Sequence, residues 1–132
     1  EMCIRDSSIQ DSNPIRGSIC RAARDIAHQV GARAIIVESA TGKVARAMVH
    51  FRPNVPIIAV VTSSLVCKKL CLNWGITALI GEEKKTSDAI TKQAMEKALS
   101  TGYFKKGDIV VVISSNRTAP TSSTDSLNVR IL

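Results

Sequence analysis

The segment from Ala32 to Val61 constrains what this chain can fold into more than any other part of it. It begins with the apolar run Ala34–Val37 and then breaks into small polar residues over Ser39–Gly42. An amphipathic helix is predicted from Lys43 to Phe51, and a second apolar run, Val55–Val61, closes the segment. A strand, a loop, a helix and a strand within about thirty residues make the βαβ unit of a parallel sheet.

The same alternation continues on both sides of this unit. A helix is predicted to begin at Asn13-Pro14, where a capping residue precedes a proline at the first helical position, and to end at Gly31. After Val61 the chain is predicted to turn through Thr62–Ser64 into a short helix to about Leu72, followed by a strand over Ile76–Ile80, a helix over Ser87–Ser100 and a strand over Ile109–Ile113. Strands that alternate with helices predict an α/β fold, in which a parallel sheet is covered by helices on both faces.

The last segment follows a different pattern. A polar loop rich in Ser and Thr is predicted over Ser114–Ser126. Leu127, Val129 and Ile131 then alternate with polar residues, which indicates a half-buried edge strand.

Size and composition favour one soluble domain with an aliphatic core. Only 3% of the 132 residues are aromatic, so Ile, Val, Leu and Ala must fill the interior. No apolar run reaches the roughly 18 residues that a membrane helix needs. Arg5 and Asp6 interrupt any run resembling a signal peptide. We therefore expect a cytoplasmic protein whose domain spans residues 13–132, with residues 1–12 as a disordered or non-native tail.

The net charge of +7 raises the question of nucleic-acid binding. The basic residues are scattered, however, and form doublets only at Lys68-Lys69, Lys84-Lys85 and Lys105-Lys106. No stripe of Lys and Arg alternates with aromatic residues, and no RNA-binding motif is present. The charge therefore predicts a solvated surface with some attraction for anionic small molecules, and neither a nucleic-acid nor a membrane partner.

The four cysteines, Cys3, Cys20, Cys67 and Cys71, do not predict a disulfide framework in a chain with this much aliphatic sequence. Cys67 and Cys71 are four residues apart and share a helix face, which supplies half of a metal site. Structural zinc needs four ligands at defined spacings, and no second pair accompanies these two. Reduced thiols and no metal site are therefore the prediction.

The loop Ser39-Ala40-Thr41-Gly42-Lys43 is the candidate binding site. It follows a predicted parallel strand, and ligands of such sheets gather where the strands end. It is not a nucleotide P-loop, because Val37 and Val44 occupy positions that require Gly and Ser or Thr. Two interpretations remain open: a short anion cradle built from hydroxyls, a glycine and a lysine, or an ordinary capped helix start.

Catalytic motifs are missing from the chain. No Gly-x-Ser-x-Gly elbow is present, and the eleven acidic residues are dispersed along the sequence. His50 is predicted to be a surface residue at a helix end. The chain therefore assembles no enzyme active site by itself.

Several of these segments together resemble the C-terminal domain of pyruvate kinase. The resemblance rests on Gly31–Val37, the loop Ser39–Lys43, Ala45-Arg46, Phe51-Arg52-Pro53 followed by Val55-Pro56, Trp74-Gly75-Ile76, and the segment Gly102–Val111 with its Phe104-Lys105-Lys106-Gly107-Asp108 sequence. It covers about residues 14–132. The combination of an Arg-Pro that precedes one strand and a Lys-Gly-Asp that precedes another is specific to this family.

The resemblance implies a three-layer α/β domain whose five-stranded sheet is mostly parallel and whose last strand runs antiparallel. The parent enzyme transfers a phosphoryl group from phosphoenolpyruvate to ADP in glycolysis, with Mg²⁺ and K⁺, in a separate barrel domain. This chain would then carry no catalytic residue and no cofactor of its own. The family's C-terminal domain helps to assemble a homotetramer and, in many members, binds an allosteric sugar bisphosphate.

The same resemblance assigns the effector phosphate to Ser39, Ala40, Thr41, Gly42 and Lys43, with Arg117 as a second contact. Two positions depart from the family pattern: Val44 stands where a Ser or Thr is typical, and residues 115–121 contain no glycine. Each lost hydrogen bond to a charged group costs about 1.5–3 kcal/mol. The alternative hypothesis is a stand-alone module that senses small phosphorylated molecules.

Overall fold

The computed structural model of the chain describes residues 14–39, 41–73, 75–82, 87–115 and 124–132. The predicted tail, residues 1–12, lies outside these ranges. The order of elements is α2 (Pro14–Val30), β1 (Ala34–Glu38), α3 (Lys43–His50), β2 (Ile57–Val61), α4 (Ser64–Leu70), β3 (Ile76–Ile80), α5 (Ser87–Ser100), β4 (Ile109–Ser115) and β5 (Thr124–Ile131). Within these residues, no helix is both long and apolar enough to cross a membrane.

The five strands form one sheet in the order β3-β2-β1-β4-β5. The pairs β3–β2, β2–β1 and β1–β4 are parallel, while β4–β5 is antiparallel. The predicted α/β class, with a mostly parallel sheet and an antiparallel last strand, is therefore confirmed. Because β1 is the central strand, its end and the loop that follows it lie in the middle of the sheet's carboxyl edge.

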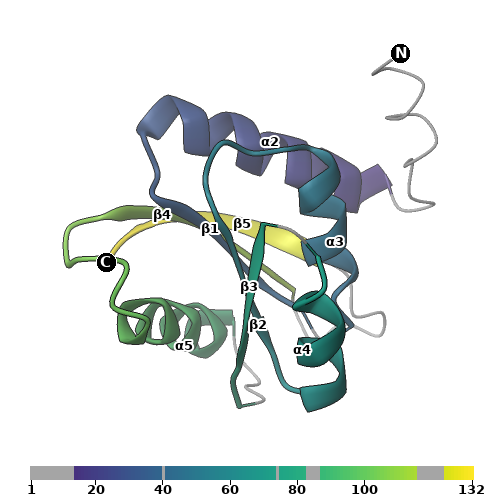
Figure 1. Cartoon of the computed structure of the whole chain (residues 1–132). Helices are drawn as coiled ribbons and strands as arrows, with labels where there is room; N and C mark the ends of the chain where they lie inside the picture. The colour runs from purple at the N-terminus through teal and green to yellow at the C-terminus, as the bar shows by residue number, and fades with distance from the viewer. Residues whose placement is uncertain (1–13, 40, 74, 83–86, 116–123) are drawn as a thin grey trace.

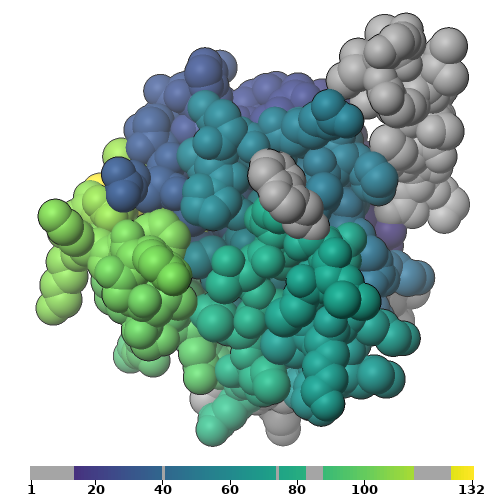
Figure 2. Space-filling model, in the orientation of Figure 1, coloured from purple at the N-terminus to yellow at the C-terminus, as the bar shows by residue number. Residues whose placement is uncertain are grey.

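Helices cover both faces of the sheet, which confirms the three layers (Figure 1). On one face, side chains from α2, α3 and α4 pack with Ile35, Val37 and Val111 in a single apolar cluster. On the other face, Ala94 and Ala98 of α5 pack with the alternate residues of the same strands. In Figure 2, the teal residues around α4 and β3 lie below the blue residues of the α2–α3 half of the molecule. All residues of β1 and β2 are buried, as a strand covered on both faces requires.

Several element boundaries differ from the prediction: β1 extends to Glu38, β4 extends to Ser115, and α3 ends at His50 rather than Phe51. Strand β2 begins at Ile57 rather than Val55, because Pro56 has no N–H and contributes only its carbonyl, which accepts from Ile35 N at 3.0 Å. Helix α4 ends at Leu70 rather than near Leu72. The predicted loop Ser114–Ser126 is shorter, since the β4–β5 ladder includes the pair Ser114 with Ser126. Ladder hydrogen bonds join backbone groups, so polar side chains do not prevent this pairing.

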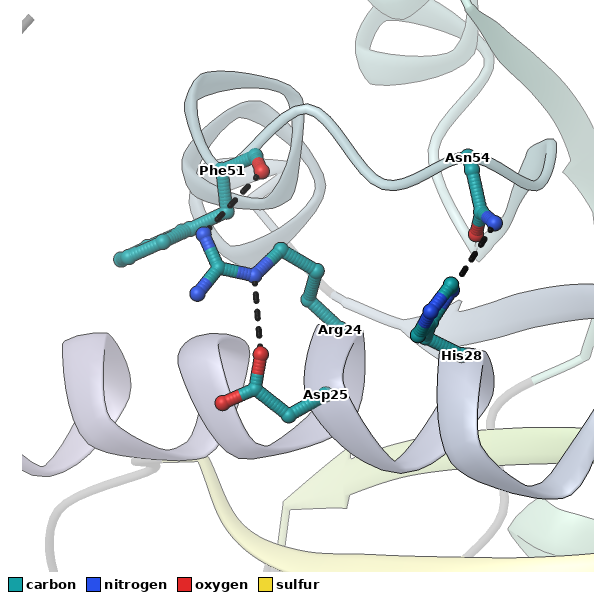
Figure 3. A network of polar contacts seen from close by, with 5 residues as sticks. All are labelled: Arg24, Asp25, His28, Phe51 and Asn54. Atoms are coloured by element: carbon teal, nitrogen blue, oxygen red, sulfur yellow. Dashed lines mark hydrogen bonds and ion pairs between the residues drawn. The ribbon is translucent and has the colours of Figure 1, made fainter.

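Polar contacts join α2 to the segment that leads from α3 into β2 (Figure 3). The guanidinium of Arg24 lies 5.7 Å from the centre of the Phe51 ring, and its Nη1 donates to the Phe51 carbonyl at 3.5 Å. Arg24 also forms an ion pair with Asp25 at 3.1 Å. One turn further along α2, His28 Nδ1 lies 3.2 Å from Asn54 Nδ2. These contacts join α2 to the chain that follows α3.

Candidate functional site

The loop between β1 and α3 is held in shape by Ser39. This side chain is only 5% exposed, and its Oγ accepts a hydrogen bond from Gly42 N at 2.9 Å. The Ser39 N–H donates to the carbonyl of Val60 at 3.1 Å, which ties the start of the loop to β2. The Ser39 hydroxyl is therefore used inside the loop, where it fixes the turn.

Gly42 caps the amino end of α3 in a left-handed conformation, with φ of 82° and ψ of 0°. A Cβ atom at this position would lie 3.1 Å from Leu70 Cδ2 and 3.2 Å from Val66 Cγ1. Both the backbone angle and the close approach of α4 therefore require glycine here. One side of the helix entrance is closed by these two apolar side chains of α4.

The opposite side of the loop is open to solvent and carries positive charge. Thr41 and Lys43 are exposed. Arg46 lies one turn into α3, and its Nη2 donates to the Thr41 carbonyl at 3.4 Å. Thr41 Oγ1 accepts from Lys43 N at 3.5 Å, a long contact that leaves this N–H weakly satisfied. No acidic residue occupies the first turn of α3, so the positive end of the helix dipole is not neutralised locally.

The structure thus brings together four of the six predicted site residues: Ser39, Thr41, Gly42 and Lys43. Ala40 and Arg117 lie outside the described residues. The sequence prediction did not include Arg46. Its position three residues after Lys43 is the signal that places both cations near the same helix end.

Two further polar residues at this edge were not predicted. Glu38, the last residue of β1, is 3% exposed, and Ser114 of the neighbouring strand β4 is fully buried. Val37 of β1 pairs with Ile113 of β4. Glu38 and Ser114 are the next residues of these two strands, and both lie on the face covered by α5. Among the described residues, the Ser114 hydroxyl has no hydrogen-bond partner. The candidate loop lies on the α3 side of the same edge.

Two cavities of the described structure lie elsewhere. One, of about 740 Å³, lies between α5 and β5, and the other, of about 830 Å³, lies at the amino ends of β2 and β3. Neither is lined by the loop Ser39–Lys43, which is an open surface rather than a cavity. The described residues bring together no three His, Cys, Asp or Glu side chains suited to a metal ion.

The chain is similar to known proteins over most of its length. A family model described as "Pyruvate kinase, alpha/beta domain" matches residues 17–130. The chain is 36% identical to a pyruvate kinase of Clostridium acetobutylicum over 92% of its own length and 25% of that relative's. It is 31% identical to a pyruvate kinase of Bacillus licheniformis over 80% of its own length and 18% of that relative's. A pyruvate kinase of Corynebacterium glutamicum is 26% identical over 89% of the chain and 25% of the relative.

The chain therefore spans a quarter or less of the length of these three relatives. The family match covers all the described strands and helices except the first three residues of α2 and the last residue of β5. The order of strands, the antiparallel last pair and the matched residues lead to one conclusion. The chain belongs to the family of the pyruvate kinase alpha/beta domain.

Proposed function

We propose that this domain serves a cytoplasmic pyruvate kinase in two ways: it contributes to subunit assembly, and its β1–α3 loop binds the phosphate of a sugar-bisphosphate effector. The parent enzyme would transfer a phosphoryl group from phosphoenolpyruvate to ADP in a separate barrel domain. The domain proposed for this role is residues 13–132. The observation that carries the effector proposal is the group of exposed Thr41 and Lys43 with half-buried Arg46 at the amino end of α3.

The chemistry of these three residues suits a phosphate group. Lys43 offers a compact ammonium, and Arg46 offers a guanidinium that matches two phosphate oxygens at once. The Thr41 hydroxyl supplies a neutral donor. Gly42 lets the backbone approach closely, and the start of α3 adds a favourable dipole.

Two features limit the strength of this binding. The Ser39 hydroxyl is already bonded to Gly42 N. Val44 has no hydroxyl and is 6% exposed, so its side chain belongs to the core. We therefore propose Ser39 and Gly42 as the residues that shape the loop, and Thr41, Lys43 and Arg46 as those that contact the phosphate, with Ala40 and Arg117 as further contacts.

The described part of the chain offers no donor set for the Mg²⁺ and K⁺ of the parent reaction. Mg²⁺ prefers carboxylate, phosphate and water oxygens in near-octahedral geometry, and no such cluster is present in the described ranges. We propose that both act in the barrel domain and that this domain alone has no kinase activity.

Calorimetric titration of the 132-residue chain with fructose 1,6-bisphosphate tests the effector proposal. Lys43→Ala should weaken binding by about tenfold or more, because a hydrogen bond to a charged group is worth about 1.5–3 kcal/mol. Lys92→Ala, which removes an exposed lysine on α5, is the matched control for net charge. The absence of heat at millimolar ligand, or equal losses in both variants, would contradict the proposal.

The stand-alone phosphate sensor remains the second candidate, and the same three residues, Thr41, Lys43 and Arg46, support it. The reading frame upstream of this chain separates the two candidates. Barrel-encoding sequence directly upstream is expected for the pyruvate kinase domain. A stop codon with no barrel sequence would favour the sensor.

A further inference from the structure

The last turn of α4 and its C-cap carry two thiols that the proposed function does not use, Cys67 and Cys71. Cys67 and Cys71 are both free cysteines. The Cys71 N–H donates to the Cys67 carbonyl at 3.0 Å, and Cys71 has helical angles, with φ of −60° and ψ of −20°. The helical turn between them is therefore complete. Residues four apart on a complete turn project their side chains from the same face.

Both thiols are accessible and interact with each other. Cys71 is exposed, and Cys67 is half-buried with one side against the main apolar cluster. Burial raises the pKa of the Cys67 thiol, and the charge and hydrogen bonding of Cys71 raise it further. The raised pKa keeps the metal-free thiol protonated at neutral pH, so a bound ion must displace its proton.

The spacing decides which chemistry this pair supports. Residues four apart on a helix have Cβ atoms about 5–6 Å apart, whereas a disulfide needs about 3.5–4.5 Å. A disulfide would therefore require the last turn of α4 to unwind. An ion placed between the sulfur atoms adds two metal–sulfur bonds of about 2.3 Å each, and it spans the pair without that distortion.

The number of ligands decides which ion fits. Structural zinc takes four ligands, and no group of three His, Cys, Asp or Glu side chains converges in the described part of the chain. Thiolate sulfur is a soft ligand and selects soft cations such as Cu(I). Monovalent cations with a filled d shell accept two thiolates in a nearly linear arrangement.

We propose that Cys67 and Cys71 form a chelating dithiol site for a soft monovalent cation, with Cu(I) as the reference ion. Each thiol releases one proton to solvent, and each sulfur forms one bond to copper. Copper keeps its oxidation state throughout, so the step needs no oxidant or reductant. Binding weakens as the pH falls, because protons compete with the metal ion for both sulfur atoms.

The test is an anaerobic competition between the full chain and a chromophoric Cu(I) chelator, performed in a Cys3→Ser background. The parent should withdraw one equivalent of Cu(I) from the chelator. Cys67→Ser and Cys71→Ser should each weaken Cu(I) affinity by more than about 100-fold, the upper end of the effect of outer-shell partners of metal ligands. Cys20→Ser, which alters a buried thiol of α2, should retain the site.

A spacing variant provides the matched control. Cys71→Ser combined with Leu72→Cys keeps the number of thiols but moves one of them off the shared face, at a position that is 88% exposed. This variant should lose Cu(I) binding while its far-ultraviolet circular dichroism stays unchanged. Cu(I) should also protect Cys71 of the parent from alkylation, as mass spectrometry of its peptide would show. The proposal is overturned if the double variant Cys67→Ser/Cys71→Ser, or the spacing variant, competes as well as the parent.

Discussion

At the scale of single residues, Gly42 joins the candidate loop to α4. Its left-handed φ of 82° and the 3.1 Å separation between its Cβ position and Leu70 Cδ2 act together. Gly42→Ala should lower the free energy of unfolding by about 1–3 kcal/mol, the range for a non-glycine residue held in this region. Urea denaturation followed by circular dichroism would measure the change.

Gly102→Ala is the control for this substitution. Gly102 has a similar φ of 79°, but nothing lies within 4 Å of its Cβ position. It should show the backbone effect without the contact with α4, and hence a smaller loss than Gly42→Ala. Equal losses of unfolding free energy in the two variants would mean that the side chains of α4 move aside without cost and do not position the loop.

Cys67 gives the metal-free protein a dependence of stability on pH. Burial raises the pKa of its thiol above the ordinary value of 9.0, and Cys71 contributes further. The folded state therefore holds this proton more tightly than the unfolded state does. The resulting stability is complete below the unfolded pKa and is lost as pH rises through the folded pKa.

Urea denaturation between about pH 8 and pH 11 measures this loss. The free energy of unfolding of Cys67→Ala should decline less than that of the parent over this range, since the variant lacks the titrating thiol. The decline for Cys71→Ala should lie between those of the parent and Cys67→Ala, because this variant lacks Cys71 but Cys67 stays buried. An identical decline in all three proteins would rule out a role for Cys67.

At the scale of elements, a single glutamine holds α5 to the end of β3. Gln93 is 8% exposed; its Oε1 accepts from Glu82 N at 2.7 Å, and its Nε2 donates to Glu82 O at 2.8 Å. Gln93→Ala should lower the free energy of unfolding by about 1–3 kcal/mol, because two backbone groups lose their partner.

Substitution of the exposed neighbour, Lys92→Ala, should change the free energy of unfolding by less than about 0.5 kcal/mol. Gln93→Glu adds a sharper comparison, since a carboxylate accepts from Glu82 N but has no proton to donate to Glu82 O. It should therefore be destabilised at neutral pH. A fully stable Gln93→Glu protein would show that the second hydrogen bond contributes nothing.

Elements with both an apolar pattern and a clear end signal were predicted well. Helix α5 (Ser87–Ser100) and strand β3 (Ile76–Ile80) have the predicted bounds, and the helix predicted to open at Asn13-Pro14 is described from Pro14 to Val30. The ladder between Ser114 and Ser126 was predicted as loop, because backbone pairing leaves no mark on a run of Ser and Thr. Apolar periodicity reports which side chains are buried, and not which backbones pair.

The sequence located the candidate loop between a strand and a helix, but it did not reveal which contacts each side chain of the loop makes. A serine before a helix indicates a cap, yet it does not reveal that Ser39 would bond to Gly42 N and be buried. Arg46 was overlooked because its guanidinium reaches the loop only after α3 has formed. Its placement is a product of helix geometry.

At the scale of the whole molecule, the edge strand β5 exposes apolar side chains. Val129 and Ile131 of the edge strand β5 are 45% and 66% exposed, and they line the cavity against α5 together with Met95 and Leu99. An edge strand with unpaired backbone groups and apolar side chains is suited to pairing with another chain. This surface supports the proposed role in subunit assembly.

Sedimentation velocity tests that role. The chain should associate with itself at high micromolar concentration, and Val129→Lys should shift it to monomer, because a lysine on an edge strand opposes pairing. Thr77→Lys is the matched control: Thr77 is exposed on β3, at the opposite edge of the sheet. The proposal would be contradicted if the parent stayed monomeric, or if Val129→Lys and Thr77→Lys reduced self-association equally. Assembly would then not depend on β5.

The central position of β1 also has a consequence for the order in which the chain folds. Ile35 pairs with Ile57, which is close in sequence, and with Val111, which is far along the chain. Closing the shorter connection loses less chain entropy, so β1, α3 and β2 can meet early, whereas β4 reaches β1 only after a long loop has closed. Substitutions between β1 and β2 should therefore slow refolding, while those in β4 and β5 should mainly accelerate unfolding. The half of the domain that carries the candidate loop would thus become ordered before the half that carries β5.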